Sequence, residues 1–215
     1  MSEPQIIKFG VPQGSVLGPL LFIIYINELP NVVVSCNVEL YADDALIYFA
    51  SKSVDDIQAH LTADLPRISN WLQANYLILN LDKTKAMLVG THQKIASAGA
   101  LETDIMHKRL ELVENFKYLW VLLDQTLSWK DHIDYIGSKI SSRLGVLRRA
   151  RKVLPKATCL LLYNTLILPL FDYCLPVWDS CGAGSKAYLD KLNRRAASII
   201  EGRTVCTEEL RSALR

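Results

Sequence analysis

Several features that define common protein classes are missing from this sequence. The five cysteines are widely separated, odd in number and never arranged as CxxC, which argues against a disulfide framework and a zinc ribbon. The four histidines are isolated as well, so each is expected to have a packing or surface role rather than to bind a metal. The longest apolar run covers only residues 20–26, and residues 1–8 show no signal-peptide pattern. We therefore expect a soluble, intracellular protein.

The chain also has little net charge, but its charges are unevenly distributed. The total is +2, with nine basic and 14 acidic residues in residues 1–129, and 15 basic and eight acidic residues in residues 130–215. The first stretch thus carries −5 and the second +7. An acidic part followed by a basic part suggests a carboxylate site beside a surface for an anionic polymer. A solvated, charge-rich helical segment explains the same composition equally well.

The first part of the chain alternates helix and strand signals. Half of the 215 residues are hydrophobic, so the chain can bury a core. Pro19 is well placed to begin a buried helix over residues 19–28. Residues 38–41 and 45–50 are strand-like and are separated only by Ala42-Asp43-Asp44. This pattern predicts a β-hairpin with two carboxylates at its tip.

Short elements are expected in the middle of the chain. Ser53 and the acidic residue three positions later resemble a capping box at the start of an amphipathic helix. Apolar and β-branched residues predict short strands at residues 77–80, 85–89 and 116–124. The polar residues 91–108 are predicted to form a loop.

The last part of the chain is predicted to be helical. A first helix begins at Asp131, and its apolar side chains share one narrow arc of a helical wheel: Ile133, Ile136, Ile140, Leu144 and Leu147. A second, more buried helix over residues 156–168 is expected to end at Pro169. A third helix is predicted around residues 188–199, with Lys191, Arg194 and Arg195 on its outer side.

Two adjacent aspartates at a hairpin tip are costly unless something neutralises them. Like charges so close repel each other, and a divalent cation between them removes the repulsion. Carboxylates are the usual Mg²⁺ ligands in phosphoryl-transfer sites, where two metal ions clamp the attacking and leaving oxygens. Most Asp-Asp pairs are ordinary exposed turn residues, so the pair alone favours a metal site only weakly.

The sequence around the aspartate pair resembles the palm motifs of reverse transcriptases. Tyr41-Ala42-Asp43-Asp44 resembles the YxDD box, and GVPQGSVLGPLLF at residues 10–22 is similar to the second palm motif. Downstream, residues 71–84 resemble the next palm motif, and Phe116-Lys117-Tyr118-Leu119 resembles the hairpin that supports the primer end. Residues 161–178 are similar to the thumb. These motifs follow the family's order, and they resemble most closely the enzymes of non-LTR, LINE-like retrotransposons.

The resemblance implies roles for residues of the palm. Asp43 and Asp44 would hold Mg²⁺ and be catalytic. Gln13 and Gly14 would line the pocket for the incoming dNTP and the template base, since a backbone without a Cβ can approach a nucleotide closely. Tyr41 would pack beneath the primer end.

The resemblance also implies roles for basic residues. Lys83 would lie near the triphosphate, although a surface lysine in a loop is an equally good interpretation. Arg148, Arg149 and Lys152 lie outside the apolar arc of the first thumb helix. They would track the phosphates of the template–primer duplex with little regard to its sequence.

Two features depart from the family's pattern. In the family a first aspartate precedes the second palm motif, whereas here the sole carboxylate before Gly10 is Glu3. The first metal ligand and the fingers are therefore expected to be missing, and a two-metal site without them should not bind its metals in working geometry. Trp120 stands where the family usually has glycine, so its indole should distort the hairpin or point outward.

These observations predict an α+β fold: a partial polymerase palm, with a small antiparallel sheet and packed helices, followed by a helical thumb. The palm is expected at residues 1–129, the thumb at 130–202 and a tail at 203–215. The predicted function is that of a fragment of an RNA-directed DNA polymerase, which adds dNTPs to a primer 3′-OH and is expected to be inactive alone.

The implied partners are an RNA template, a DNA primer, dNTP, Mg²⁺ and a longer polypeptide that supplies the N-terminal half. The alternative is a non-catalytic nucleic-acid-binding or interaction remnant of a decayed retrotransposon. The missing upstream aspartate favours this alternative for the chain standing alone.

Overall fold

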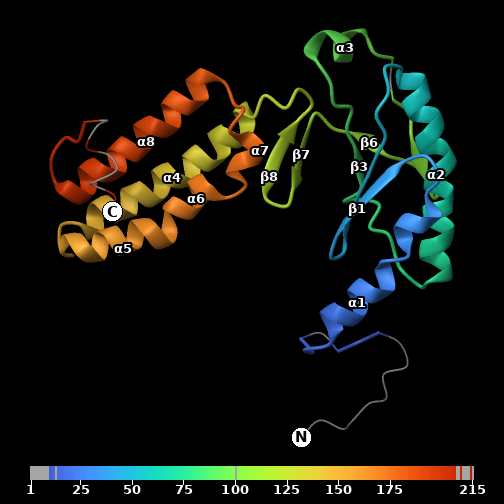
Figure 1. The fold of residues 1–215 in the computed structure, drawn as a ribbon, viewed down its shortest axis with the longest axis horizontal. Helices are drawn as coiled ribbons and strands as arrows, with labels where there is room; N and C mark the ends of the chain where they lie inside the picture. The colour runs from blue at the N-terminus through green and yellow to red at the C-terminus, as the bar shows by residue number, and fades with distance from the viewer. Residues whose placement is uncertain (1–9, 13, 100, 207–208, 210–213, 215) are drawn as a thin grey trace, which may run out of the picture. The chain divides into compact units, whose positions relative to one another are not determined.

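The computed structural model describes residues 10–12, 14–99, 101–206, 209 and 214. It divides the chain into two compact units (Figure 1). The first unit consists of Met1–Leu88 and Ala96–Val113, and the second of Val89–Ile95 and Glu114–Arg215.

The first unit combines two α-helices with short strands. In chain order it contains α1 (Gly18–Ile26), the 3-10 helix η1 (Leu29–Val32), β1 (Asn37–Tyr41), β2 (Asp44–Tyr48), α2 (Val54–Ala74), β3 (Lys85–Ala86), β4 (Asp104–Ile105), β5 (Lys108–Arg109) and β6 (Glu111–Leu112). The short helix α3 (His92–Ser97) lies between β3 and β4 in the chain. The expected small antiparallel sheet is present as separate two-stranded sheets, of which β3–β6 is parallel. Helices beside short sheets agree with the predicted α+β class.

The hairpin β1–β2 forms as predicted. Its antiparallel register pairs Tyr41 with Asp44, so the connecting loop consists of Ala42 and Asp43 alone. Alternate side chains of the hairpin face inward, where Leu40 and Ile47 pack against a small core. The buried residues of that core come from α1, η1 and α2: Ile26, Leu29, Ile68 and Leu72.

Helix α1 begins close to the predicted position, but the prediction that it is buried is wrong. Its proline stands in the first turn, as expected. Leu20 and Ile24, however, are 55% and 63% exposed, and the one apolar side chain of α1 that is buried is Ile26. The apolar run predicts a helix, but the burial of its side chains depends on neighbouring elements. Within the described part of this unit, such neighbours lie only near the C-terminal end of the helix.

Three further local predictions are wrong. Ser53 precedes α2 without a side-chain capping hydrogen bond, so no capping box forms. Residues 77–80 form no strand, and the strand expected at residues 85–89 is reduced to β3. The expected loop at residues 91–108 contains α3 and the β4–β5 hairpin, whose turn residues Met106 and His107 have positive φ. That turn type usually carries Asn or Gly, so its sequence signal is missing here.

The second unit is a β-hairpin followed by a helical bundle. It contains β7 (Asn115–Tyr118), β8 (Val121–Asp124), α4 (Lys130–Ala150), α5 (Lys156–Leu166), α6 (Leu168–Asp172), α7 (Leu175–Trp178) and α8 (Ala183–Glu201). The predicted apolar arc of α4 is confirmed, because all five of its residues are buried in the main core. Figure 1 shows α4, α5 and α8 as the long helices of this unit.

Helix α5 differs from its prediction in length and in burial. It ends at Leu166, two residues earlier than expected, and Pro169 opens the next helix instead of closing this one. Proline is tolerated in a first helical turn because the N–H that it lacks has no partner there. Only Cys159 and Tyr163 of α5 are buried, so it is not the more buried helix.

Asp124 organises the entry into α4. Its side chain is 9% exposed and accepts hydrogen bonds from the backbone N–H groups of Thr126, Ser128 and Trp129 at 2.9–3.0 Å. Burial alone would raise the pKa of Asp124, but the hydrogen bonds from Thr126, Ser128 and Trp129 hold that pKa below its ordinary value. A charged acceptor at this position satisfies backbone N–H groups of the loop that leads into α4, which would otherwise lack partners.

The β7–β8 hairpin belongs to the second compact unit, although the palm was predicted to extend to residue 129. Asp124 and the buried Val121 attach β8 to the helical core. The compact boundary therefore lies near residue 113. The assignment of palm to residues 1–129, thumb to 130–202 and tail to 203–215 stays a prediction.

The turn between β7 and β8 explains why a glycine would suit position 120. Tyr118 pairs with Val121, which leaves Leu119 and Trp120 as a two-residue loop with φ of 44° and 67°. Positive φ at both loop residues is the pattern of a type I′ turn, which favours glycine at its second position. The Trp120 indole is 64% exposed and points away from the core, as expected.

Replacing Trp120 with Gly should raise the free energy of unfolding by about 1 kcal/mol. Relief of the left-handed backbone conformation, which costs about 1–3 kcal/mol, outweighs the loss of exposed cation–π contacts worth about 0.5–1 kcal/mol. Urea unfolding followed by circular dichroism measures the change. Trp120→Ala is the matched control, since it removes the indole but keeps the strain, and it should be less stable than Trp120→Gly. Clear destabilisation by Trp120→Gly would show that the indole is a packing element.

Candidate functional site

The aspartate pair lies at an exposed position on the β1–β2 hairpin. Asp43 stands in the two-residue loop after Ala42, whose φ is 52°, and Asp44 is the first residue of β2. Both carboxylates are exposed, and neither forms an ion pair among the described residues. Tyr41 is also exposed, at 63%. The geometry therefore presents two unneutralised carboxylates next to an aromatic ring.

A buried carboxylate that sequence reasoning missed holds the segment leading into this hairpin. Asp64 of α2 is fully buried and accepts hydrogen bonds from the backbone N–H groups of Val34 at 3.2 Å and of Ser35 and Cys36 at 2.8 Å. These residues immediately precede β1. The signal in the sequence is an aspartate beside Leu65 on the buried face of an amphipathic helix.

The charge of Asp64 is stabilised where it lies. Burial alone would raise its pKa, but the backbone hydrogen bonds from Cys36, Ser35 and Val34 outweigh burial and hold the pKa below its ordinary value. Arg67, one turn later in α2, adds an ion pair at 3.7 Å. Burial of the Cys36 thiol, and then the negative charge of Asp64, raise the pKa of that thiol to about 11.

The segment before α1 contains Gly14 in a conformation that favours glycine. Its φ is +85°, and no atom lies within 4 Å of the position that a Cβ would occupy. Backbone conformation therefore accounts for glycine here, whether or not a nucleotide approaches it. Gln13 lies outside the described residues. Gly14 shares the first unit with the aspartate pair, and its predicted closeness to the pair stays a prediction.

Lys83 lies in an exposed turn, where its N–H donates to the carbonyl of Asn80 at 3.2 Å. The neighbouring charges are paired, with Lys85 to Glu111 at 2.5 Å and Lys108 to Asp82 at 2.6 Å. Lys83 forms no ion pair with any residue that the structure describes. Its ammonium group is thus available to an anion, and its predicted role at a triphosphate stays a prediction.

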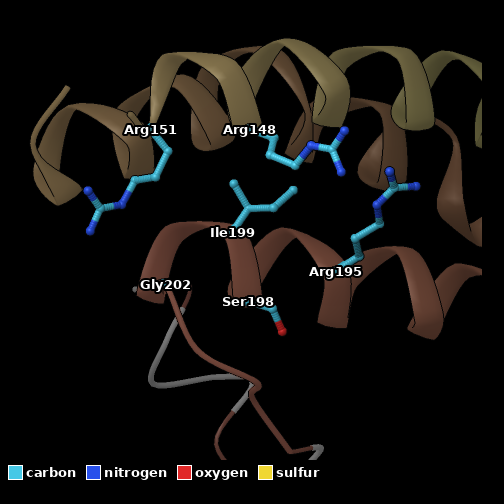
Figure 2. A pocket seen from close by; sticks show the side chains of 6 residues that line it. All are labelled: Arg148, Arg151, Arg195, Ser198, Ile199 and Gly202. Carbon is cyan, nitrogen blue, oxygen red and sulfur yellow. The ribbon is translucent and has the colours of Figure 1, made fainter. Parts of the chain in front are cut away.

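In the second unit, arginines from two helices surround a shallow hollow. Its volume is about 390 Å³, and its lining includes Arg148 and Arg151 of α4 and Arg195 of α8. Figure 2 shows the guanidinium groups of Arg148 and Arg195 on one side of Ile199 and that of Arg151 on the other. Arg151 is anchored by donating to the carbonyl of Ile200 at 3.0 Å.

Only one of the three predicted basic residues belongs to this hollow. Arg148 lines the hollow, whereas Arg149 and Lys152 are exposed and do not line it. Sequence reasoning placed Arg195 on the outer side of its helix but not beside Arg148. Among the described residues, none that lines the hollow is acidic. The hollow therefore offers planar, forked donors that suit phosphate oxygens.

The aspartate pair supplies only part of a metal-binding set. Among the described residues, no group of three or more His, Cys, Asp or Glu side chains could hold a metal ion. The chemistry of the two carboxylates does suit Mg²⁺, a hard cation that prefers oxygen ligands and keeps several waters. No helix of the described residues is long and apolar enough to span a membrane.

Comparisons with known proteins identify relatives of the chain. Residues 2–140 match the family described as reverse transcriptase (RNA-dependent DNA polymerase). The chain is 25% identical over 210 residues to a probable RNA-directed DNA polymerase from transposon X-element of Drosophila melanogaster, covering 94% of this chain and 23% of that protein. It is 28% identical over 200 residues to the RNA-directed DNA polymerase from mobile element jockey of the same species, covering 86% and 21%.

A further relative comes from another fly. Over 214 residues the chain is 26% identical to a retrovirus-related Pol polyprotein from type-1 retrotransposable element R1 of Bradysia coprophila, covering 94% of this chain and 21% of that protein. The chain thus spans less than a quarter of the length of each of these three relatives. No solved structure matches the chain.

Replacing Asp64 with Asn should lower the free energy of unfolding at pH 7 by about 2–3 kcal/mol, because an amide group then faces backbone N–H donors. The folded-state pKa of Asp64 is lowered. Its contribution is therefore present above the unfolded pKa of about 4 and is lost as the pH falls through the folded value. Urea unfolding between neutral and acidic pH should show the difference between the two proteins shrinking at low pH.

The control is Asp55→Asn, an exposed residue in the first turn of the same helix. Its effect should stay below about 1 kcal/mol, the usual limit for an exposed charge near a helix N-terminus. Equal effects of the two substitutions at every pH would mean that Asp64 does not hold the segment before β1.

Proposed function

Because this chain belongs to the reverse transcriptase (RNA-dependent DNA polymerase) family and its relatives are non-LTR retrotransposon proteins, we propose that it is the palm-and-thumb portion of such a polymerase. The parent reaction is template-directed addition of dNTPs to a primer 3′-OH on RNA. The first unit would contribute the carboxylate site, and the second would hold the template–primer duplex.

The observation that carries this proposal is the pair of exposed carboxylates in a tight hairpin whose leading segment is fixed by a buried charge. Asp43 and Asp44 would hold Mg²⁺, which when bound supplies the positive charge that phosphoryl transfer needs. The short loop limits the freedom of Asp43, and the strand register limits that of Asp44. Asp64 restricts the backbone before β1. Preorganised ligands of this kind suit catalysis.

Around this pair, further residues have proposed roles. Tyr41, exposed beside the carboxylates, would support the primer end. Gln13 and Gly14 would line the nucleotide pocket, and Lys83, which forms no ion pair with a described residue, would approach the triphosphate. These roles rest on the family motifs.

The alternative function is non-catalytic nucleic-acid binding. It is favoured by two observations: the aspartate pair lacks a third ligand among the described residues, and the arginine hollow belongs to the other compact unit. A longer polypeptide that supplies the missing ligand would make the chain part of an active enzyme.

The purified 215-residue chain should not extend a primer. Mg²⁺ needs near-octahedral coordination, and two carboxylates from one hairpin should bind it weakly and loosely. Primer extension is measured on primed RNA with dNTPs and Mg²⁺ or Mn²⁺, and Mn²⁺ binding is measured separately by electron paramagnetic resonance. The control is Asp43→Asn/Asp44→Asn. Extension that disappears in this control would overturn the expectation and imply a replacement ligand, with Glu3, which lies outside the described residues, as the first suspect.

The second unit should bind RNA–DNA duplex weakly and in a salt-dependent way. Arg148→Glu/Arg195→Glu should weaken binding and reduce the slope of log affinity against log salt by roughly 0.9 for each lost phosphate contact. Fluorescence anisotropy with a labelled duplex at several salt concentrations measures both quantities.

The matched variant is Arg149→Glu/Lys152→Glu, which changes the charge equally but leaves the hollow intact. It should also weaken binding, though less, if these residues belong to the predicted surface. Equal losses of affinity in the two variants would show that net charge alone causes the effect. Unchanged binding in both variants would remove this face of α4 from the binding surface.

A further inference from the structure

Two lysines of the second unit gather between two aromatic rings. The ammonium nitrogen of Lys117, in β7, lies 4.1 Å from the Trp120 ring centroid and 5.1 Å from that of Tyr135. The ammonium nitrogen of Lys139, in α4, lies 5.5 Å and 4.3 Å from the same two centroids. Lys117 also donates a hydrogen bond to the Tyr135 hydroxyl at 3.1 Å. We call these four residues the lysine–aromatic cluster.

The cluster contains positive charge without a balancing carboxylate. Neither Lys117 nor Lys139 forms an ion pair within the described part of the chain. The two ammonium groups hold the pKa of the Tyr135 hydroxyl below its ordinary value, chiefly through hydrogen bonds and then through their charge. Two like charges beside the same rings repel each other, and an anion between them would remove that repulsion.

A small cavity opens beside the cluster. Its volume is about 250 Å³, and its lining includes Trp120, Tyr135, Lys139, Ile136, Tyr173 and His132. No acidic residue lines it within the part of the chain that the structure describes. This volume lies below the range of about 300–1,000 Å³ typical of pockets for whole drug-sized ligands. The cavity therefore suits one flat ring system rather than a larger molecule.

His132 adds a buried polar group to the lining of this cavity. Its side chain is 2% exposed, and its Nδ1 accepts a hydrogen bond from the backbone N–H of Leu122 at 3.2 Å. Burial lowers the pKa of His132, so the ring is neutral and carries its proton on Nε2. That Nε2–H group has no hydrogen-bond partner among the residues that the structure describes. A buried donor without a partner costs free energy, which an acceptor on a bound ring could recover.

We propose that the lysine–aromatic cluster and its cavity bind one unpaired nucleotide of a nucleic-acid strand, with its phosphate between Lys117 and Lys139 and its base against Trp120. This inference rests on the proposed function for the choice of a nucleic-acid strand, whereas the nucleotide chemistry rests on the cluster itself. Aromatic rings stack on any base, and lysines neutralise the backbone, so the site has little sequence preference.

The geometry favours a single-stranded nucleotide over a base pair. Trp120 projects from a hairpin turn beside the helix that carries Tyr135 and Lys139, and the small cavity lies between these elements. A base held in a duplex presents only its edge, whereas an unpaired base can offer its face to the indole. The site would therefore hold an unpaired nucleotide.

The test measures binding of the full chain to fluorescein-labelled oligothymidylate and to an abasic strand of the same length, by anisotropy. The unmodified chain should bind oligothymidylate more tightly than the abasic strand. Trp120→Leu, which keeps a non-glycine residue in the turn, should lose this preference and weaken oligothymidylate binding at least about fivefold. Thermal unfolding by circular dichroism confirms that each variant is folded.

The lysines have a separate readout. Lys117→Gln/Lys139→Gln should weaken the binding of both strands. It should also reduce the slope of log affinity against log salt by about 0.7 per lysine. The matched control is Lys130→Gln/Lys191→Gln, which removes two exposed lysines outside the cluster and should leave the preference for bases unchanged. Competition with thymidine monophosphate should exceed competition with inorganic phosphate, which separates a nucleotide from a bare anion.

Equal affinity of the unmodified chain for the two strands, or an undiminished preference in Trp120→Leu, would overturn the proposal. If inorganic phosphate competed as well as thymidine monophosphate, the site would bind only an anion, and the proposal would likewise be wrong. Asp43→Asn/Asp44→Asn should bind oligothymidylate like the unmodified chain. Failure of the catalytic proposal and failure of this one are therefore distinguishable.

Discussion

A fully buried carboxylate fixes the part of the chain on which the candidate catalytic pair depends. Asp64 sits on α2 but binds three successive backbone N–H groups in the segment that leads into β1. Without an acceptor these N–H groups would need other partners, because the segment has no strand neighbour of its own. The position of the β1–β2 hairpin beside α2 follows from this contact and from the small apolar core around Ile68 and Leu72. Asp124 solves a similar problem at the start of α4.

Local patterns predicted the elements well where the pattern and the packing agree. The hairpin carrying Asp43 and Asp44 follows from strand-like runs around a short loop, and the α4 face follows from apolar spacing alone. The exposure of Leu20 and Ile24 could not be predicted, since periodicity shows which side chains are apolar and not which neighbours cover them. The failure at residues 77–80 has the same cause: a strand needs a partner, and a single segment does not reveal one.

The sites were predicted less completely than the elements, again for physical reasons. The family motifs identified the aspartate pair, but Asp64, Arg195 and His132 gain their significance from residues far away in the sequence. Trp120 was recognised as a departure from the family, yet its contacts with Lys117 and Lys139 depend on α4 packing beside the hairpin. Distances of this kind are a property of the fold.

The basic sites of α4, the exposed aspartate pair and the buried Asp64 have different roles in the chain. From Lys139 to Arg148 the helix rises by about 14 Å, so one rigid element carries both basic sites. Asp43 and Asp44 are exposed and Asp64 is fully buried, so substitutions at the pair are expected to change the free energy of unfolding little and substitutions at Asp64 to change it much. In a lineage no longer selected for polymerisation, substitutions at the exposed pair would pass cellular quality control, while substitutions at Asp64 would send the protein to degradation. Such a lineage would lose its chemistry first and keep its shape and its basic surface longest.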